Sequence, residues 1–277
     1  MLKLMLITNQ PDFAKAAVGA GVDRVFIDLE ILGKKERQGH LDTVISAHSM
    51  DDVPKVRAAI PNSELLVRLN PPHDGIGEEI EQALQSKPEF LMLPMFHKAK
   101  ELADFCERVK GRAGVIPLVE TPEAADCLEE IVTIKGLSEI YIGLNDLHLG
   151  LKHKFIFEPV ANGMVDRMAD TIKRAGLPFG FGGIARIGEG QLPGELVLGE
   201  HLRLGSSSVI LSRTFHRGML SGEFANFGKL QYEIEKLRES EEYLLQRSPE
   251  QIELDREKVI QIVKLLIQAR NKQQGGP

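Results

Sequence analysis

Val115-Ile-Pro-Leu-Val-Glu-Thr-Pro122 and Ile140-Tyr-Ile-Gly-Leu-Asn-Asp-Leu147 are the two stretches of this sequence that decide the fold. Each is a short apolar run, rich in β-branched residues, that ends on a carboxylate, and helical sequence separates the two. Strands connected through a helix pair in parallel, so Glu120 and Asp146 are expected side by side at one edge of the sheet. Neighbouring carboxylates repel each other, and a divalent cation that prefers oxygen ligands is the simplest counter-charge.

The same alternation of apolar run and helical sequence continues along most of the chain. Strands are predicted at 2–8, 22–30, 65–70, 90–94, 115–119, 140–143, 179–184 and 208–212. Helices are predicted at 13–19, 42–47, 50–59, 77–84, 99–109, 124–131, 161–174 and 195–202. The strands are almost continuously apolar, as expected for parallel strands buried on both faces. Eight such units, without a dividing linker and without Gly-x-Gly-x-x-Gly after the first strand, favour an α/β fold of the (β/α)8 TIM-barrel type over an open sheet.

The sequence beyond the eighth strand predicts a C-terminal helical extension. Ser248-Pro-Glu-Gln251 is typical of a capping box, and the helix that follows has seven aliphatic residues between Val259 and Ile267. We therefore divide the chain into a TIM-barrel catalytic domain (1–222), a C-terminal helical extension (223–272) and a flexible tail (273–277). Because the barrel is taken to be complete at about Ser212, the aliphatic helix is expected to pack on a neighbouring subunit of a homo-oligomer. Packing on its own barrel wall is the alternative.

Charge and composition limit the class of ligand. The net charge of −6, with acidic and basic residues interspersed, argues against a protein that binds nucleic acid or a membrane surface. Neither a signal peptide nor an apolar stretch long enough to span a bilayer is recognised, so a cytoplasmic location is expected. Cys106 and Cys127 have no metal-ligand spacing and are expected to be reduced thiols. Small solutes are the expected ligands.

Polar side chains end several of the predicted strands, and the carboxyl ends of the strands form the active site of a TIM barrel. The set consists of Asp28, Glu30, Arg68, Asn70, Glu120, Asn145 and Asp146. Carboxylates of this set could hold Mg²⁺ or Mn²⁺, while Arg68 could bind a substrate carboxylate or enolate oxygen bidentately. A structural ion pair of Arg68 with Glu30 or Glu120 is the alternative. Glycine-rich segments at Phe179–Ile184 and Gly205–Ser208 flank the last two strands, where barrels often bind phosphate.

Five motifs in this order resemble the HpcH/HpaI aldolase and citrate lyase β-subunit family of the phosphoenolpyruvate/pyruvate superfamily. They are Asp28-Leu-Glu30, Leu66-Val-Arg68-Leu-Asn70, Leu93-Pro94, Pro117-Leu-Val-Glu120-Thr-Pro122 and Gly143-x-x-Asp146-Leu147, and the resemblance covers roughly residues 1 to 220. It implies that Glu120 and Asp146 ligate a divalent metal, Mg²⁺ or alternatively Mn²⁺ or Co²⁺. It also implies that Arg68 contacts the substrate and stabilises an enolate. Because Asp28, Glu30 and Asn70 belong to the same set of strand-end residues, they are expected to bind the substrate beside Arg68. Trimers or hexamers are the assemblies that the resemblance implies.

The reaction implied is cleavage or formation of a carbon–carbon bond next to a carbonyl group. The expected substrate is a 4-hydroxy-2-oxo acid, formed from a 2-oxo acid such as pyruvate or oxaloacetate and an aldehyde. Such a reaction needs a base for the hydroxyl proton. The pyruvate aldolases of the family place a histidine directly after Asp-x-Glu, whereas Ile31 stands here, so His40 and His48 are the candidate catalytic bases. His148, just past Asp146, and a metal-bound hydroxide are further alternatives.

Two other functions compete with this class II aldolase hypothesis. A citryl-CoA or malyl-CoA type thioester lyase would use an acyl-CoA substrate, for which the only clustered basic residues are those at 34–37. A non-catalytic barrel subunit is supported only by the missing histidine, and the joint presence of Glu120, Asp146 and Arg68 speaks against it. A metal-dependent carbon–carbon lyase is therefore the leading expectation.

Overall fold

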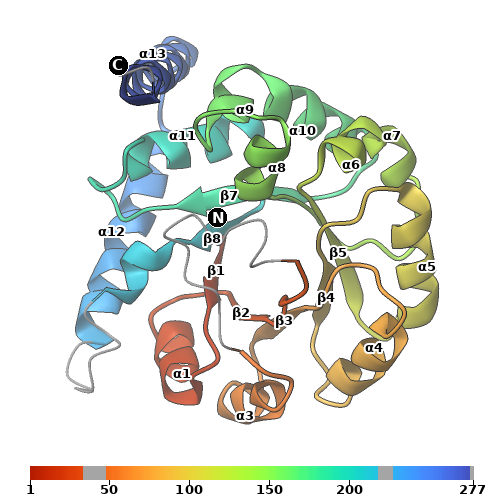
Figure 1. Cartoon of the computed structure of the whole chain (residues 1–277). Coiled ribbons are helices and arrows are strands. Elements are labelled where there is room, and N and C mark those ends of the chain that lie inside the picture. The colour runs from red at the N-terminus through yellow and green to blue at the C-terminus, as the bar shows by residue number, and fades with distance from the viewer. Residues whose placement is uncertain (34–47, 218–226, 275–277) are drawn as a thin grey trace.

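The computed structural model describes residues 1–33, 48–217 and 227–274. Eight parallel strands follow one another around a closed barrel in sequence order, and β1 pairs with β8. Helices surround this barrel (Figure 1), so the predicted TIM-barrel fold is confirmed. The strands are β1 (Lys3–Ile7), β2 (Arg24–Asp28), β3 (Glu64–Arg68), β4 (Phe90–Leu93), β5 (Gly114–Val119), β6 (Ile140–Ile142), β7 (Phe179–Ile184) and β8 (Ser208–Leu211).

The helices of the wall agree with the predicted ones in most places. They are α1 (Pro11–Gly19), α3 (Asp52–Ala59), α4 (Ile76–Leu84), α5 (Ala99–Val109), α6 (Pro122–Asp126), α7 (Leu128–Ile131), α8 (Leu144–Gly150), α9 (Glu158–Ala161), α10 (Met164–Arg174), α11 (Gly194–Leu204), α12 (Phe227–Leu245) and α13 (Pro249–Gln274). The single helix predicted at 124–131 is divided at Cys127, and the helix predicted at 42–47 lies outside the described residues.

The connection after β6 differs from the prediction. No helix was predicted between the strand at 140–143 and the helix at 161–174, but α8 begins directly after Gly143, and the short helix α9 precedes α10. Asp146 consequently lies in the first turn of α8 rather than at the end of a strand. A carboxylate in that turn interacts favourably with the positive end of the helix dipole.

Side chains fill the interior of the barrel. The inner cluster consists of Met5, Phe26, Leu66, Met92, Ile116, Leu118 and Tyr141, with Ile7, Phe90 and Ile210 packed against it. At the amino ends of the strands the buried Arg24 guanidinium donates to Glu139 at 2.9 Å and lies 4.1 Å from the centre of the Phe90 ring. The barrel is therefore a packed core, and only its carboxyl end can form a site along the barrel axis.

The glycines of β7 make room for Tyr141. A Cβ atom at Gly180 would lie 2.4 Å from the Tyr141 ring, and the Tyr141 hydroxyl donates to the Gly182 carbonyl at 2.7 Å. The same hydroxyl accepts from the Ile210 amide at 2.9 Å and so bridges the irregular β7–β8 pairing. The second glycine-rich segment, Gly205–Ser208, leads into β8 at the amino end, opposite the end where barrels bind phosphate. Both glycine-rich segments thus have structural roles.

The helix α12 completes the barrel wall after β8. It contacts α1 and α11, and Leu230, Ile234 and Leu237 are buried in the cluster that also contains side chains of β1 and β8. The expectation that the wall is complete at Ser212 therefore does not hold, because its eighth helix comes from residues assigned to the extension. None of the helices in the described residues is long and apolar enough to cross a membrane.

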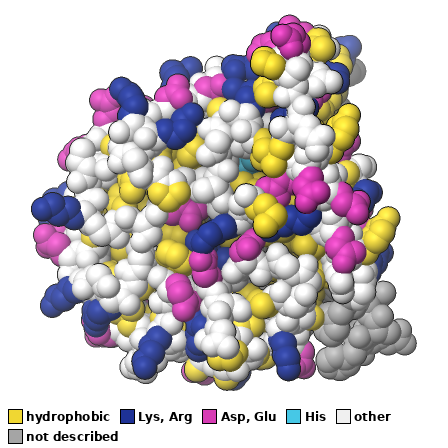
Figure 2. Space-filling view, turned by 180° about the vertical axis from the view of Figure 1, so that it is seen from behind, with side chains coloured by type: hydrophobic (Ala, Val, Ile, Leu, Met, Phe, Trp, Pro, Cys, Tyr) yellow, Lys and Arg dark blue, Asp and Glu magenta, His cyan; other side chains and the backbone are white. Residues whose placement is uncertain are grey.

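The helix α13 is the addition to the barrel, and it projects at the edge of the molecule (Figures 1 and 2). The predicted capping box is present, since the Gln251 amide donates to Ser248 Oγ at 3.3 Å and the Ser248 amide to Gln251 Oε1 at 2.8 Å. Val259 and Val263 are buried against the same chain's wall, where α13 contacts α9 and α11. Within one chain, α13 therefore packs on its own wall, while the expected homo-oligomer stays a prediction.

Candidate active site

Arg68 is the centre of the polar cluster at the carboxyl ends of the strands. It ends β3, and Asp28 ends the neighbouring strand in register with it. The Arg68 guanidinium donates from Nε to Asp28 Oδ1 and from Nη2 to Asp28 Oδ2, both at 2.8 Å, and Nη2 lies 3.3 Å from Glu30 Oε2. Both carboxylates are almost fully buried. The alternative ion pair of Arg68 with Glu30 is thus part of the structure, but Asp28 is the closer partner.

The environment keeps Arg68 charged and oriented. Burial opposes the charge, but the adjacent Asp28 and Glu30 carboxylates more than offset this and raise the pKa of Arg68. Its guanidinium also lies 5.5 Å from the centre of the Phe26 ring. Within the described part of the chain, no hydrogen bond involves Nη1, so this nitrogen can donate to a ligand oxygen.

Glu120 directly follows β5 and lies almost fully buried beside Gly143, the residue that follows β6. A Cβ atom at position 143 would lie 2.8 Å from Glu120 Oε2, so glycine leaves the space that the carboxylate occupies. Glu120 Oε1 accepts the Met95 amide at 3.1 Å. Met95 has φ 49°, a left-handed conformation that is uncommon for a residue with a side chain. The strained backbone of Met95 therefore presents the amide that orients the Glu120 carboxylate.

The charges around Glu120 are unbalanced toward the negative side. Burial, and after it the charges of Asp146 and Glu30, hold the pKa of Glu120 well above its ordinary value, while Arg68 acts in the opposite direction. Asp146, half-buried in the first turn of α8, is thus close enough to repel Glu120. A positive charge between the two carboxylates would relieve this repulsion.

The Glu120–Asp146 pair fits a hard divalent cation by its donor chemistry, since both residues offer carboxylate oxygens. No group of three or more His, Cys, Asp or Glu side chains in the described ranges is arranged to hold a metal ion. Water and substrate oxygens would therefore have to complete the coordination shell, which is typical of Mg²⁺.

Asn70, another predicted substrate-binding residue, is bonded mainly to the protein itself. Its Oδ1 accepts the backbone amides of Ile31 at 2.8 Å and Leu32 at 3.0 Å, and its Nδ2 donates to Glu79 Oε1 at 2.7 Å. The Glu79 carboxylate also accepts the Asn70 amide, at 3.1 Å. The structure therefore shows Asn70 fixing the chain that follows Glu30, and direct contact with substrate stays a prediction.

The candidate bases differ in their relation to the polar cluster. His48 lies next to the cluster, because its Nδ1 accepts the Asp28 amide at 3.0 Å, which places the ring proton on Nε2. His40 lies outside the described residues. His148 is buried, with Nδ1 3.1 Å from the Leu144 carbonyl, and burial lowers its pKa. Of the two candidate bases within the described residues, His48 is the one bonded to Asp28.

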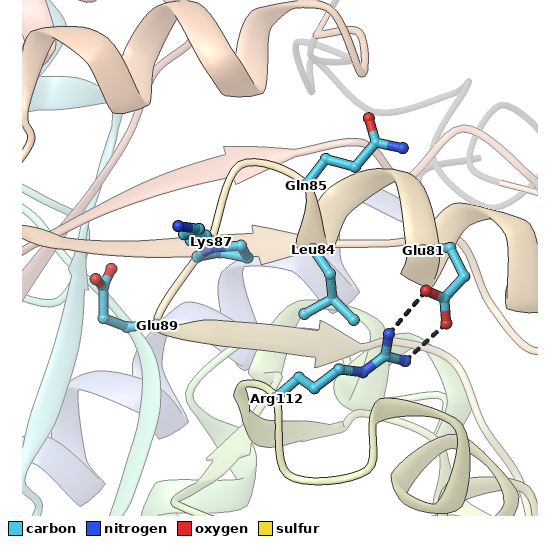
Figure 3. Close-up of a pocket in the computed structure, with 7 residues that line it drawn as sticks. Glu81, Leu84, Gln85, Lys87, Glu89 and Arg112 are labelled. Atoms are coloured by element: carbon cyan, nitrogen blue, oxygen red, sulfur yellow. Dashed lines mark hydrogen bonds and ion pairs between the residues drawn. The ribbon is translucent and has the colours of Figure 1, made fainter.

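A depression of about 540 Å³ lies at the opposite end of the barrel, before β4 and β5 (Figure 3). Three of its four charged side chains are already bonded, since Arg112 holds Glu81 through two contacts of 2.7 Å and Glu89 Oε2 accepts the Leu65 amide at 2.7 Å. It is remote from the strand-end cluster, and we do not assign the chemistry to it.

Of three comparisons with known proteins, the one with family models gives a family assignment. Residues 2–158 match the family model described as HpcH/HpaI aldolase/citrate lyase. No curated protein sequence matches the chain. Solved structures share the fold at low sequence identity. An HpcH/HpaI aldolase from Desulfitobacterium hafniense DCB-2 has 14% identity and a TM-score of 0.60, over 76% of this chain and 86% of that one. An HpcH/HpaI aldolase/citrate lyase family protein from Burkholderia cenocepacia J2315 has 18% identity and a TM-score of 0.62, over 78% of this chain and 90% of that one. The citrate synthase SbnG has 15% identity and a TM-score of 0.61, over 82% of this chain and 93% of that one.

Proposed function

This chain belongs to the HpcH/HpaI aldolase/citrate lyase family, and on that premise we propose that it is a carbon–carbon lyase that depends on a divalent metal. The proposed reaction is the reversible cleavage of a 4-hydroxy-2-oxo acid to pyruvate, or a related 2-oxo acid, and an aldehyde. The observation that carries the proposal is the geometry of Arg68. Asp28 and Glu30 orient it, no described residue bonds its Nη1, and its charge is close enough to act on Glu120.

In the cleavage direction the bond between C3 and C4 of the substrate breaks, and its electron pair stays on the 2-oxo acid as an enolate. Negative charge then develops on the oxygen of C2. Arg68 can donate from Nη1 to that oxygen, and the bidentate contact with Asp28 fixes the guanidinium before the substrate arrives. Fixed donors of this kind favour the transition state because they do not have to reorganise during the reaction.

Glu120 and Asp146 are the residues that would hold the divalent cation, Mg²⁺ or alternatively Mn²⁺ or Co²⁺. When bound, such a cation would supply Lewis-acid polarisation of the 2-oxo group. The Met95 amide keeps the Glu120 carboxylate in place. Burial of Glu120 lowers the local dielectric constant, which strengthens the interaction of its carboxylate with a cation.

The proton of the C4 hydroxyl must leave as the bond breaks, and a proton must then be added to C3 to convert the enolate into pyruvate. His48 has its proton on Nε2 while Nδ1 accepts the Asp28 amide, so it acts as a hydrogen-bond donor in this state. To serve as the base, the His48 ring has to give up the Asp28 contact or exchange its tautomer. His40 is the other candidate base in this proposal.

Exchange of the pyruvate methyl protons in D2O, followed by proton NMR, tests the proposed function. The wild-type protein with Mg²⁺ or Mn²⁺ should catalyse this exchange, and removal of the metal with EDTA should stop it, because exchange reports enolisation without an aldehyde. A parallel assay with acetyl-CoA and malyl-CoA examines the thioester-lyase alternative. Absence of exchange together with turnover of an acyl-CoA would replace the aldolase reaction with the thioester reaction.

A further inference from the structure

Two large aliphatic side chains stand exposed at the rim of the candidate site. Ile31 is 56% exposed and Leu32 is 47% exposed, directly after Glu30. The other large hydrophobic side chains that are exposed in the described residues belong to Met1 and to the C-terminal segment, namely Tyr232, Tyr243, Leu245, Leu254 and Leu265. Ile31 and Leu32 are therefore the exposed aliphatic pair next to the polar cluster.

The protein holds the backbone of this aliphatic pair in place by partly buried hydrogen bonds. Asn70 Oδ1 accepts both backbone amides, at 2.8 and 3.0 Å, and Glu79 in turn holds Asn70 through contacts of 2.7 and 3.1 Å. On the other side, Glu30 lies 3.3 Å from Arg68 Nη2. The backbone of the pair is thus fixed relative to the guanidinium that would bind the substrate.

The interior of the barrel restricts the direction in which a substrate can extend. Phe26, Leu66 and Met92 fill the barrel beneath the cluster, so a substrate bound at Arg68 has no room along the axis below it. The part of the substrate beyond the reacting carbon has to extend outward, past the rim. Aliphatic side chains at that rim favour an apolar fragment, since burying a methylene group contributes free energy that a hydroxylated or charged fragment does not gain.

We infer that Ile31 and Leu32 determine the specificity of the reaction and select a substrate whose aldehyde fragment carries an aliphatic chain. This inference rests on the proposed function. It names the substrate class as 4-hydroxy-2-oxo acids with an alkyl group on C4, in preference to substrates with a hydroxylated or carboxylated group there.

Condensation of pyruvate with a series of aldehydes tests this inference. Propanal, butanal and hexanal supply increasing alkyl chains, and glyoxylate supplies a charged acceptor of small size. In the wild-type protein kcat/KM should rise by roughly twofold to fourfold for each added methylene, the range expected for partial to full burial. Ile31→Ser and Leu32→Ser should each lower this increment, the rise in kcat/KM per methylene, to about 1.5-fold, because a polar rim buries less of the alkyl chain in apolar contact. Each kcat/KM is divided by the rate of pyruvate methyl exchange of the same variant, so that differences in the rate of enolisation between variants cancel.

Leu245→Ser is the matched control, since Leu245 is 61% exposed at the end of α12 and should leave the increment as in the wild type. An equal increment in the wild type and both rim variants would overturn the inference, and so would a wild type that prefers glyoxylate. A fall in molecular mass of the rim variants without a change in increment would assign the pair to a contact with a second copy instead. Loss of exchange in the wild type would remove the proposed function, whereas exchange without chain-length dependence would remove only this inference.

Discussion

Replacement of Arg68 by lysine separates the charge at the candidate site from its geometry. Arg68 makes two hydrogen bonds of 2.8 Å to Asp28 and a contact of 3.3 Å to Glu30. A lysine has a single nitrogen at its end and cannot reproduce a planar contact with Asp28 while also donating outward to a ligand. Arg68→Lys therefore keeps the positive charge and loses the orientation.

The expected losses can be worked from these contacts. Losing one charge-assisted hydrogen bond to a buried carboxylate should lower the free energy of unfolding by about 1.5 to 3 kcal/mol. Losing the Nη1 donor should lower the exchange rate by about 10² to 10³, the effect of removing one fixed donor to a developing oxyanion. Arg68→Ala leaves both carboxylates without their counter-charge, so its free energy of unfolding should fall by about 3 to 5 kcal/mol.

The assay is pyruvate methyl exchange by NMR, with stability measured by urea unfolding of the same samples. Arg112→Lys is the matched control, because Arg112 also binds a carboxylate bidentately, at 2.7 Å, but on the exposed surface at the opposite end of the barrel. This control should leave both stability and the exchange rate close to those of the wild type, because exposed ion pairs contribute little to stability. Exchange in Arg68→Lys within about threefold of the wild-type rate would refute the geometric role and leave only a requirement for charge.

Three further predictions concern the carboxylates, a buried histidine and α13. Glu120→Gln and Asp146→Asn should each weaken Mn²⁺ binding in calorimetry while the melting temperature without metal stays equal or rises, because repulsion is relieved; unchanged affinity in both would contradict the pair. Burial lowers the pKa of His201 to about 3, so its neutral form stabilises the fold above pH 6.5 and this contribution is lost as the pH falls, by about 1.4 kcal/mol per unit. His201→Phe should flatten urea stability between pH 6.5 and 4.5, and parallel curves would argue against this origin. Deleting residues 249–277 should lower the number of subunits per particle in light scattering, whereas an unchanged number of subunits would show that α13 is not needed for assembly.

Sequence patterns were sufficient for the barrel because its strands are buried on both faces. A continuous apolar run bounded by polar residues indicates a buried parallel strand once it recurs eight times with helical sequence between. The strand ends also place Arg68 beside Asp28 in the observed register. The local pattern therefore contains much of the information on this part of the site.

Features that depend on tertiary contacts were not predicted. The helix α8 was missed because Leu144-Asn-Asp146 resembles a strand end locally, and α12 was taken as an addition although it closes the wall. The positive φ of Met95 and its hydrogen bond to Glu120 arise where the ends of β4 and β5 meet, so the local sequence does not predict them. Proline before Met95 was visible but does not specify a left-handed residue.

Titration of the wild-type protein with Mn²⁺, in the absence and presence of oxalate, tests the central claim most directly. Oxalate is a stable planar dianion that imitates the enolate of pyruvate, so it should bind to the cation and to Arg68 together. We predict that oxalate tightens Mn²⁺ binding at least tenfold in calorimetry, about 1.4 kcal/mol of coupling, and that Arg68→Ala removes most of this coupling. Mn²⁺ affinity that is the same with and without oxalate would contradict a single site built from Arg68, Glu120 and Asp146.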